Sequence, residues 1–133
     1  MAGAAEIGRG RPKGMRILVA DNDAVSRGLI RDVLGPHGYE ILEACDGREA
    51  LALIERTRPD LVLLDIEMPF LDGYAVLGAL RSDPRFPNLP IVAVTALALQ
   101  SERDKERSAG FDAYLTKPIS PAVLRSQVKT LLN

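Results

Sequence analysis

The segment 61–65 reads Leu61-Val62-Leu63-Leu64-Asp65, four consecutive apolar residues followed by a carboxylate. An apolar run of this length predicts a strand buried on both faces, which is typical of a parallel sheet covered by helices. Turn-forming residues at 66–73 then lead the chain away, so Asp65 is expected at the strand's carboxyl end. Ligands of open α/β sheets bind at that end. An acid that begins a turn is common, however, so Asp65 alone indicates little.

Strand-like runs occur four more times after residue 15, and amphipathic stretches separate them. The predicted strands are residues 17–20, 39–45, 61–64, 91–94 and 113–115. The predicted helices run from Val25 to Gly35-Pro36, from the N-cap Asp46 to near Pro59, over 74–80, over 97–109 before Gly110, and from Ser120-Pro121 to Leu131. Strands that alternate with helices through short loops predict an α/β fold, in which helices cover both faces of a parallel sheet.

Composition and length narrow the class of protein. The 133 residues suit one domain, and a net charge of −1 argues against a broadly basic, nucleic-acid-binding surface. No apolar stretch is long enough to span a bilayer and no signal peptide is evident, so a cytoplasmic protein without a membrane partner is expected.

Cys45, the only cysteine, is predicted to pack as a small hydrophobe in its strand. His37, the only histidine, is expected at the surface without a catalytic role.

Residues 1–14 differ from the rest of the chain. They are small, basic and glycine-rich without an apolar period, which predicts a disordered tail or residues added in cloning. The stretch Arg9-Gly10-Arg11-Pro12 is similar to an AT-hook core, but so short a match does not favour DNA binding. The folded domain is therefore predicted to cover residues 15–133.

Polar residues follow four of the predicted strands. They are Asp21-Asn22-Asp23, Asp65, Thr95-Ala96 and Thr116-Lys117-Pro118. Because the carboxyl ends of parallel strands share one edge, two carboxylates, a hydroxyl and an ammonium are expected together there. Carboxylate oxygens suit Mg²⁺, and Thr95 and Lys117 could donate to an anion beside it. These are the parts needed to move a phosphoryl group onto Asp65.

With these motifs, residues 15–133 resemble the receiver domain of bacterial two-component response regulators over its full length. The matching segments are 17–21, 63–69, 72–73, 94–96 and 114–119. The resemblance implies a flavodoxin-like, doubly wound (βα)5 fold with a five-stranded parallel sheet of order 2-1-3-4-5. It further implies that Asp65 accepts a phosphoryl group from a histidine kinase or a histidine phosphotransfer protein.

The resemblance also implies roles for the neighbours of Asp65. Thr95 would move toward the phosphoryl group, Lys117 would pair with it, and the small Ala96 would leave it accessible. Tyr114 would swing inward as the switch aromatic, and the bond between Lys117 and Pro118 would be cis. The chain would then be a signalling phosphoacceptor with slow autodephosphorylation and no external substrate, not an enzyme. The alternatives of flavin binding and dehalogenase-type phosphatase chemistry fit these residues poorly.

The implied metal ligands are Asp21, Asn22, Asp65 and the backbone carbonyl of Glu67. Asn22 departs from the family pattern, which has two adjacent acids at this point. An amide oxygen brings no charge, so we expect weaker Mg²⁺ binding and slower phosphorylation than in a typical receiver. Asp23 is expected to cap the next helix and not to replace the missing acid.

The implied output is altered protein binding through helix 97–109, strand 113–115 and the last helix. Leu97, Leu99 and Tyr114 are the expected partner surface, because Leu97, Ala98 and Leu99 cannot all point inward. The protein would be a monomer or a phosphorylation-dependent dimer, acting as a single-domain regulator or phosphorelay shuttle. The alternatives left open are a phosphorylation-independent interaction module and a receiver fragment of a larger hybrid kinase or regulator.

Overall fold

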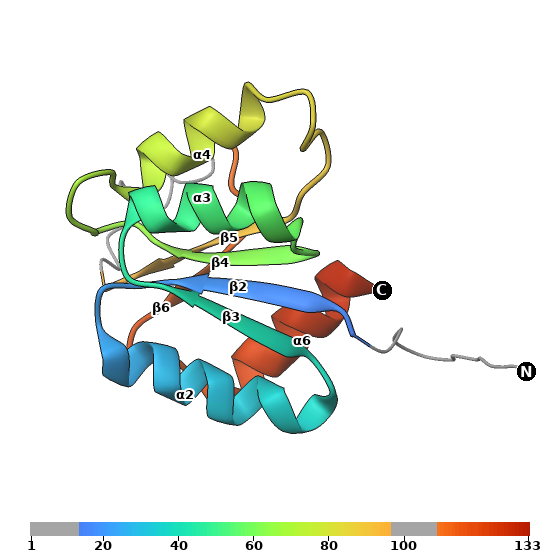
Figure 1. Cartoon of the computed structure of the whole chain (residues 1–133). Helices are drawn as coiled ribbons and strands as arrows, with labels where there is room; N and C mark the ends of the chain where they lie inside the picture. The colour runs from blue at the N-terminus through green and yellow to red at the C-terminus, as the bar shows by residue number, and fades with distance from the viewer. Residues whose placement is uncertain (1–13, 97–108) are drawn as a thin grey trace, which may run out of the picture.

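The computed structural model describes residues 14–96 and 109–133, which form one parallel sheet with helices on both faces (Figure 1). The sheet has five strands in the order β3-β2-β4-β5-β6, and every neighbouring pair is parallel. The strands are β2 Arg16–Ala20, β3 Glu40–Ala44, β4 Leu61–Asp65, β5 Ile91–Thr95 and β6 Ala113–Thr116. This is the predicted order 2-1-3-4-5, so the doubly wound α/β fold is confirmed.

The helices lie in two layers. They are α2 Ala24–Leu34, the 3₁₀ turn η1 Gly35–His37, α3 Gly47–Thr57, α4 Gly73–Arg81 and α6 Pro121–Leu132. In Figure 1, α3 and α4 lie above the sheet and α2 and α6 lie below it. None of the helices in these ranges is long and apolar enough to cross a membrane. The predicted helix 97–109, Leu97, Leu99 and Arg9–Pro12 lie outside the described residues.

Alternation along the strands divides the core into two clusters. Ile17 and Val19 of β2 pack toward α2 and α6, whereas Leu18 and Ala20 pack toward α3 and α4. Strand β4 is buried at all of its positions, as the unbroken apolar run predicted. The central strand is therefore fixed from both sides, and it carries Asp65 at its last position.

Side-chain caps fix several of the helices that leave the carboxyl edge of the sheet. Asp23 accepts from the Val25 amide at 3.0 Å, and Asp46 accepts from the Glu49 amide at 2.8 Å. The predicted N-caps Asp23, Asp46 and Ser120 are thus confirmed.

Helix α2 ends at Leu34 with Gly35 as its C-cap, as predicted, and the separate 3₁₀ turn η1 then leads to Gly38 at φ 89°. One local prediction was wrong. Cys45 is exposed, because β3 stops at Ala44 and Cys45 begins the turn into α3. Its backbone N–H donates to Glu49 Oε1 at 2.7 Å rather than to a neighbouring strand.

Candidate functional site

The register of the three neighbouring strands brings the predicted polar residues together. Asp65 pairs with Val94, so β4 ends one residue before β5 does. Thr95 pairs with Thr116, and the Lys117 amide donates to the Thr95 carbonyl at 2.7 Å. Lys117 therefore follows β6 at the same edge of the sheet as Asp65, with β5 between the two strands.

Lys117 lies between two buried carboxylates. Its Nζ is 2.9 Å from Asp21 Oδ2 and 3.4 Å from Asp65 Oδ2. Asp21 and Asp65 are 1% and 4% exposed, so water screens this charge arrangement poorly. One ammonium faces two carboxylates, and the cluster has an excess of negative charge.

The pKa values follow from this arrangement. Burial, and then the charge of Asp21, raise the pKa of the Asp65 carboxyl to about 6. Burial alone would lower the pKa of Lys117, but its hydrogen bond with Asp21 and the charge of Asp65 raise it above the usual value. The site thus favours additional positive charge.

Backbone amides hold the other oxygen of each carboxylate. Asp65 Oδ1 accepts from the Glu67 amide at 3.0 Å, and Asp21 Oδ1 accepts from the Asp23 amide at 2.8 Å. Each acid thus has one oxygen fixed by the turn that follows its strand and one oxygen facing Lys117. These turns orient both carboxylates toward the same point.

Magnesium fits the donor set, but only modestly. Asp21 and Asp65 supply two buried carboxylates, while Asn22 and Glu67 are exposed residues of the adjoining turns. Oxygen donors with room for water are what Mg²⁺ takes in proteins. Over residues 14–96 and 109–133, no group of three or more His, Cys, Asp or Glu could hold a metal. An asparagine where the family pattern has a second acid leaves the set at two carboxylates.

The remaining predicted residues lie around this cluster. Thr95 is buried and Ala96 is exposed. Tyr114 is half-buried on β6 against the core cluster beneath α3 and α4, and the Lys117–Pro118 bond is cis. Tyr114 is the one member of the predicted partner surface within the described residues.

Two supporting residues were missed from the sequence. Arg27 of α2 donates from its guanidinium to the Asp21 carbonyl at 2.6 Å and pairs with Glu43 at 3.1 Å. Gly73, the first residue of α4, donates its amide to the Ile66 carbonyl at 2.8 Å. The sequence alone gives the pair Asp72-Gly73 no physical role. In the structure Asp72 caps α4, and Gly73 lets that helix approach the backbone at the end of β4.

We expect Gly73→Ala to destabilise the protein by about 1–3 kcal/mol, because the new Cβ overpacks the site. That atom would lie 2.7 Å from Ile66 Cα and 2.8 Å from the Asp65 carbonyl oxygen. Gly78→Ala, on the same helix with nothing within 4 Å, is the matched control and should stabilise by up to about 1 kcal/mol. Urea denaturation of both variants measures the difference. Equal stabilities would show that α4 can shift without cost.

Comparison with known proteins identifies the family of this chain. The model of the response regulator receiver domain family matches residues 17–129. The polar-differentiation response regulator DivK of Brucella anthropi is 34% identical over 117 residues, covering 88% of this chain and 95% of DivK. The "probable transcriptional regulator ycf27" of Porphyridium aerugineum is 39% identical over 118 residues, 89% of this chain. The chain spans only 48% of ycf27.

A solved structure shows the same architecture with a metal. The receiver domain of the sensor histidine kinase PA1611 from Pseudomonas aeruginosa has a TM-score of 0.82 and 34% identity. The match covers 90% of this chain and 98% of that one, and that structure has a magnesium ion coordinated in its active site cleft. The fold agrees with these matches, and the chain belongs to the response regulator receiver domain family.

Proposed function

We propose that Asp65 accepts a phosphoryl group from the phosphohistidine of a histidine kinase or a histidine phosphotransfer protein. The observation that carries this proposal is the pairing of Lys117 with both Asp21 and Asp65 at the carboxyl edge. A carboxylate oxygen of Asp65 would attack phosphorus, a P–O bond would form, and the P–N bond to the imidazole would break. Lys117 would pair with the phosphoryl oxygens as their charge develops.

Asp21, Asn22, Asp65 and the backbone carbonyl of Glu67 are the residues proposed to hold Mg²⁺. When bound, the ion would offset the negative charge of the carboxylates and of the incoming phosphoryl group. The excess negative charge around Lys117 supports this role. Asn22 makes the site weaker than one with an additional acid, because divalent affinity depends on ligand charge.

A phosphoryl group on Asp65 would change the contacts of Lys117 and Thr95. Lys117 now pairs with two carboxylates, and a phosphoryl group would compete for it. We propose that the Thr95 hydroxyl then turns toward the phosphoryl group and Tyr114 moves inward. The output would be altered protein binding by residues 97–109, β6 and α6, with Leu97, Leu99 and Tyr114 in contact with the partner. The exposed Ala96 would let water reach the acyl phosphate, which would give slow autodephosphorylation.

The test is phosphotransfer from a panel of phosphorylated histidine kinases, with an alkali-labile, hydroxylamine-sensitive phosphoryl group on the chain as the expected product. Asn22 favours a second candidate, a receiver that works without phosphate. Acetyl phosphate or beryllofluoride with Mg²⁺ separates the two, because a phosphate-independent module shows no spectral change with either. No transfer from any kinase and no change with either small molecule would contradict the phosphoacceptor role.

An apolar groove beside Lys117 offers a place for the phosphodonor protein. It has a volume of about 440 Å³ and lies between the start of α2 and the loop after β6. Val25 and Leu29 of α2 line it and are 79% and 37% exposed, and Pro118 and Ile119 form its other side. Exposed apolar side chains next to the acceptor are a typical docking surface, so we propose that the donor packs here.

Val25→Gln is expected to slow transfer from a phosphohistidine protein by about five- to tenfold, since it removes apolar contact without adding charge. Transfer from acetyl phosphate should be unchanged, because the chemistry at Asp65 is intact. Val123→Gln on α6, where the valine is 48% exposed and outside the groove, is the matched control. Equal slowing by the two variants, or equal slowing with acetyl phosphate, would contradict docking at this groove.

A further inference from the structure

A second cavity lies at the edge of the sheet opposite Asp65. Its volume is about 620 Å³, and Leu34, His37, Tyr39, Arg125, Ser126, Lys129 and Asn133 line it. Tyr39 precedes β3, whose first residue Glu40 pairs with the first residue of β2. Helix α6 begins after β6 and runs back toward this end of the sheet, as Figure 1 shows. The cavity therefore opens where α2 and α6 separate, away from the carboxyl edge.

The lining of this cavity is cationic. It includes Arg125 and Lys129 and no acidic side chain, in a chain whose net charge is −1. Arg125 and Lys129 are four positions apart on α6 and hence on one face of that helix. The sequence of α6, Pro121–Leu132, contains no acidic residue that could pair with them.

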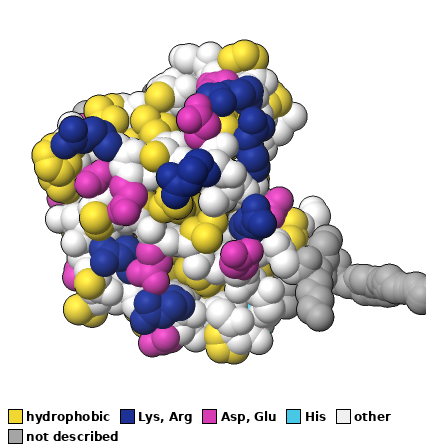
Figure 2. Space-filling view, viewed as in Figure 1, with side chains coloured by type: hydrophobic (Ala, Val, Ile, Leu, Met, Phe, Trp, Pro, Cys, Tyr) yellow, Lys and Arg dark blue, Asp and Glu magenta, His cyan; other side chains and the backbone are white. Residues whose placement is uncertain are grey.

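Several other arginines of the described ranges have carboxylate partners. Arg27 and Arg31 pair with Glu43, and Arg81 pairs with Asp112 at 2.8 Å. Cationic and anionic side chains are interspersed on the face shown in Figure 2. Within residues 14–96 and 109–133, neither Arg125 nor Lys129 has such an ion pair. Two cationic side chains that line one cavity without an acidic side chain among the other lining residues favour an anion there.

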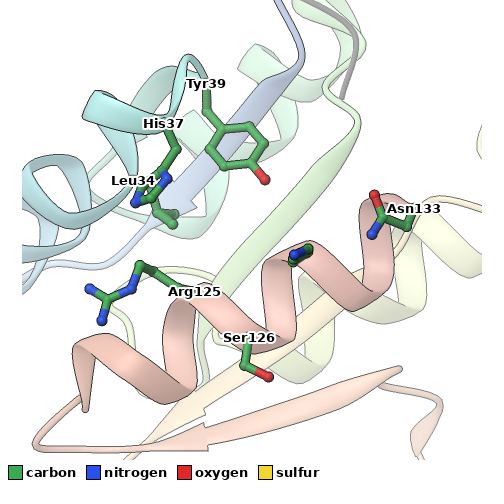
Figure 3. Close-up of a pocket in the computed structure, with 7 residues that line it drawn as sticks. Leu34, His37, Tyr39, Arg125, Ser126 and Asn133 are labelled. Atoms are coloured by element: carbon green, nitrogen blue, oxygen red, sulfur yellow. The ribbon is translucent and has the colours of Figure 1, made fainter. Parts of the chain in front are cut away.

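The opposite wall suits a planar group. Figure 3 shows Leu34, His37 and Tyr39 on one side of the cavity and Arg125 and Asn133 on α6 across from them. Tyr39 is half-buried, and it packs against the core while also lining the cavity. An aromatic ring held in this way is a stacking platform for a planar ring. Ser126 and Asn133 are the other polar residues of the lining.

We propose that this cavity binds a small anion that carries a planar ring, of the nucleoside monophosphate class. The phosphate would pair with Arg125 and Lys129, and the base would stack on Tyr39. A volume of about 620 Å³ lies within the range of small-molecule sites and exceeds what a bare phosphate would fill. A hollow between two helices also favours a small molecule over a protein surface. The site is independent of phosphorylation at Asp65.

The test is titration of the whole chain, in EDTA, with AMP, GMP, CMP and UMP, followed by amide NMR shifts and calorimetry. We expect saturable binding of at least one nucleotide, with shifts confined to residues 34–39 and 125–133. Arg125→Gln should weaken that binding by about tenfold, since it removes a charge-assisted contact. Arg56→Gln, an exposed arginine on α3 away from the cavity, is the matched control and should leave affinity unchanged.

Titrations with ribose 5-phosphate, adenosine and inorganic phosphate measure separately how much the phosphate and the base of the nucleotide contribute to affinity. Tyr39→Leu, which keeps the residue apolar, should weaken nucleotide binding and leave ribose 5-phosphate binding unchanged. Three outcomes would overturn the proposal. The first is that none of the four nucleotides binds saturably. The second is that inorganic phosphate binds as tightly as the nucleotides (an adventitious ion only). The third is that Arg125→Gln and Arg56→Gln lose affinity equally.

Discussion

Asp65→Asn is expected to abolish phosphorylation and, at the same time, to make the metal-free protein more stable. The amide of asparagine is not a nucleophile for phosphorus, so no acyl phosphate should form with any histidine kinase or with acetyl phosphate. The stability gain has a different cause. Asp65 and Asp21 are both buried and share one ammonium, so ionised Asp65 is unfavourable in the folded protein.

The sign and the pH range of this effect follow from the pKa of Asp65. Because folding raises that pKa from 3.8 to about 6, the folded protein holds the proton more tightly than the unfolded chain does. The free energy of unfolding therefore falls as pH rises from about 4 to about 6, and the full penalty remains above that range. Asparagine carries no such penalty. The variant should be more stable by about 1–3 kcal/mol at pH 7 and nearly equal at pH 4.

Urea denaturation in EDTA at both pH values measures the stability change, and a phosphate-affinity gel measures phosphorylation. Asp32→Asn on α2, whose side chain is 78% exposed, is the control and should leave both readouts unchanged. Acyl phosphate on the Asp65→Asn variant would place the acceptor elsewhere. A loss of stability at pH 7 would show that Lys117 fully offsets the two carboxylates.

The sequence was sufficient to predict the layers of the fold and the grouping of Asp21, Asp65, Thr95 and Lys117. Both follow from one rule, because alternating strands and helices put all the strand carboxyl ends at one edge. The buried run Leu61–Leu64 is informative for the same reason, since only a strand covered on both faces is apolar at every position.

Contacts and cavities that form where two helices, or a helix and a strand, come together could not be predicted from this rule. Gly73 matters because α4 approaches the backbone of Asp65, and no local pattern encodes that distance. The cavity beside Tyr39 arises where α2 and α6 separate, so its lining comes from segments about 90 residues apart in the chain. Cys45 was placed in a strand that ends one residue earlier, and an error of one position reversed its predicted burial.

Asn22→Asp is expected to raise Mg²⁺ affinity on the order of tenfold or more and to raise the phosphorylation rate in parallel at low Mg²⁺. The substitution adds a carboxylate beside Asp21 and Asp65, where the excess negative charge around Lys117 already favours a cation. Asn22→Asp should also lower the free energy of unfolding in EDTA, because a third carboxylate then repels the other two at the carboxyl edge of the sheet. Mg²⁺ should restore the free energy of unfolding. The rates of the two proteins should converge at saturating Mg²⁺, because the added acid acts on metal binding.

Asn88→Asp is the matched control, because it adds the same charge in an exposed loop that precedes β5, at the opposite edge of the sheet. Calorimetric titration with Mg²⁺ and acetyl phosphate kinetics over a range of Mg²⁺ concentrations compare the two variants. Equal affinities in both would mean that Asn22 takes no part in metal binding. A higher affinity without faster phosphorylation would mean that metal occupancy does not limit the reaction at Asp65. If Mg²⁺ affinity and phosphorylation rate both rise in Asn22→Asp and neither rises in Asn88→Asp, the charge at position 22 controls the reactivity of Asp65.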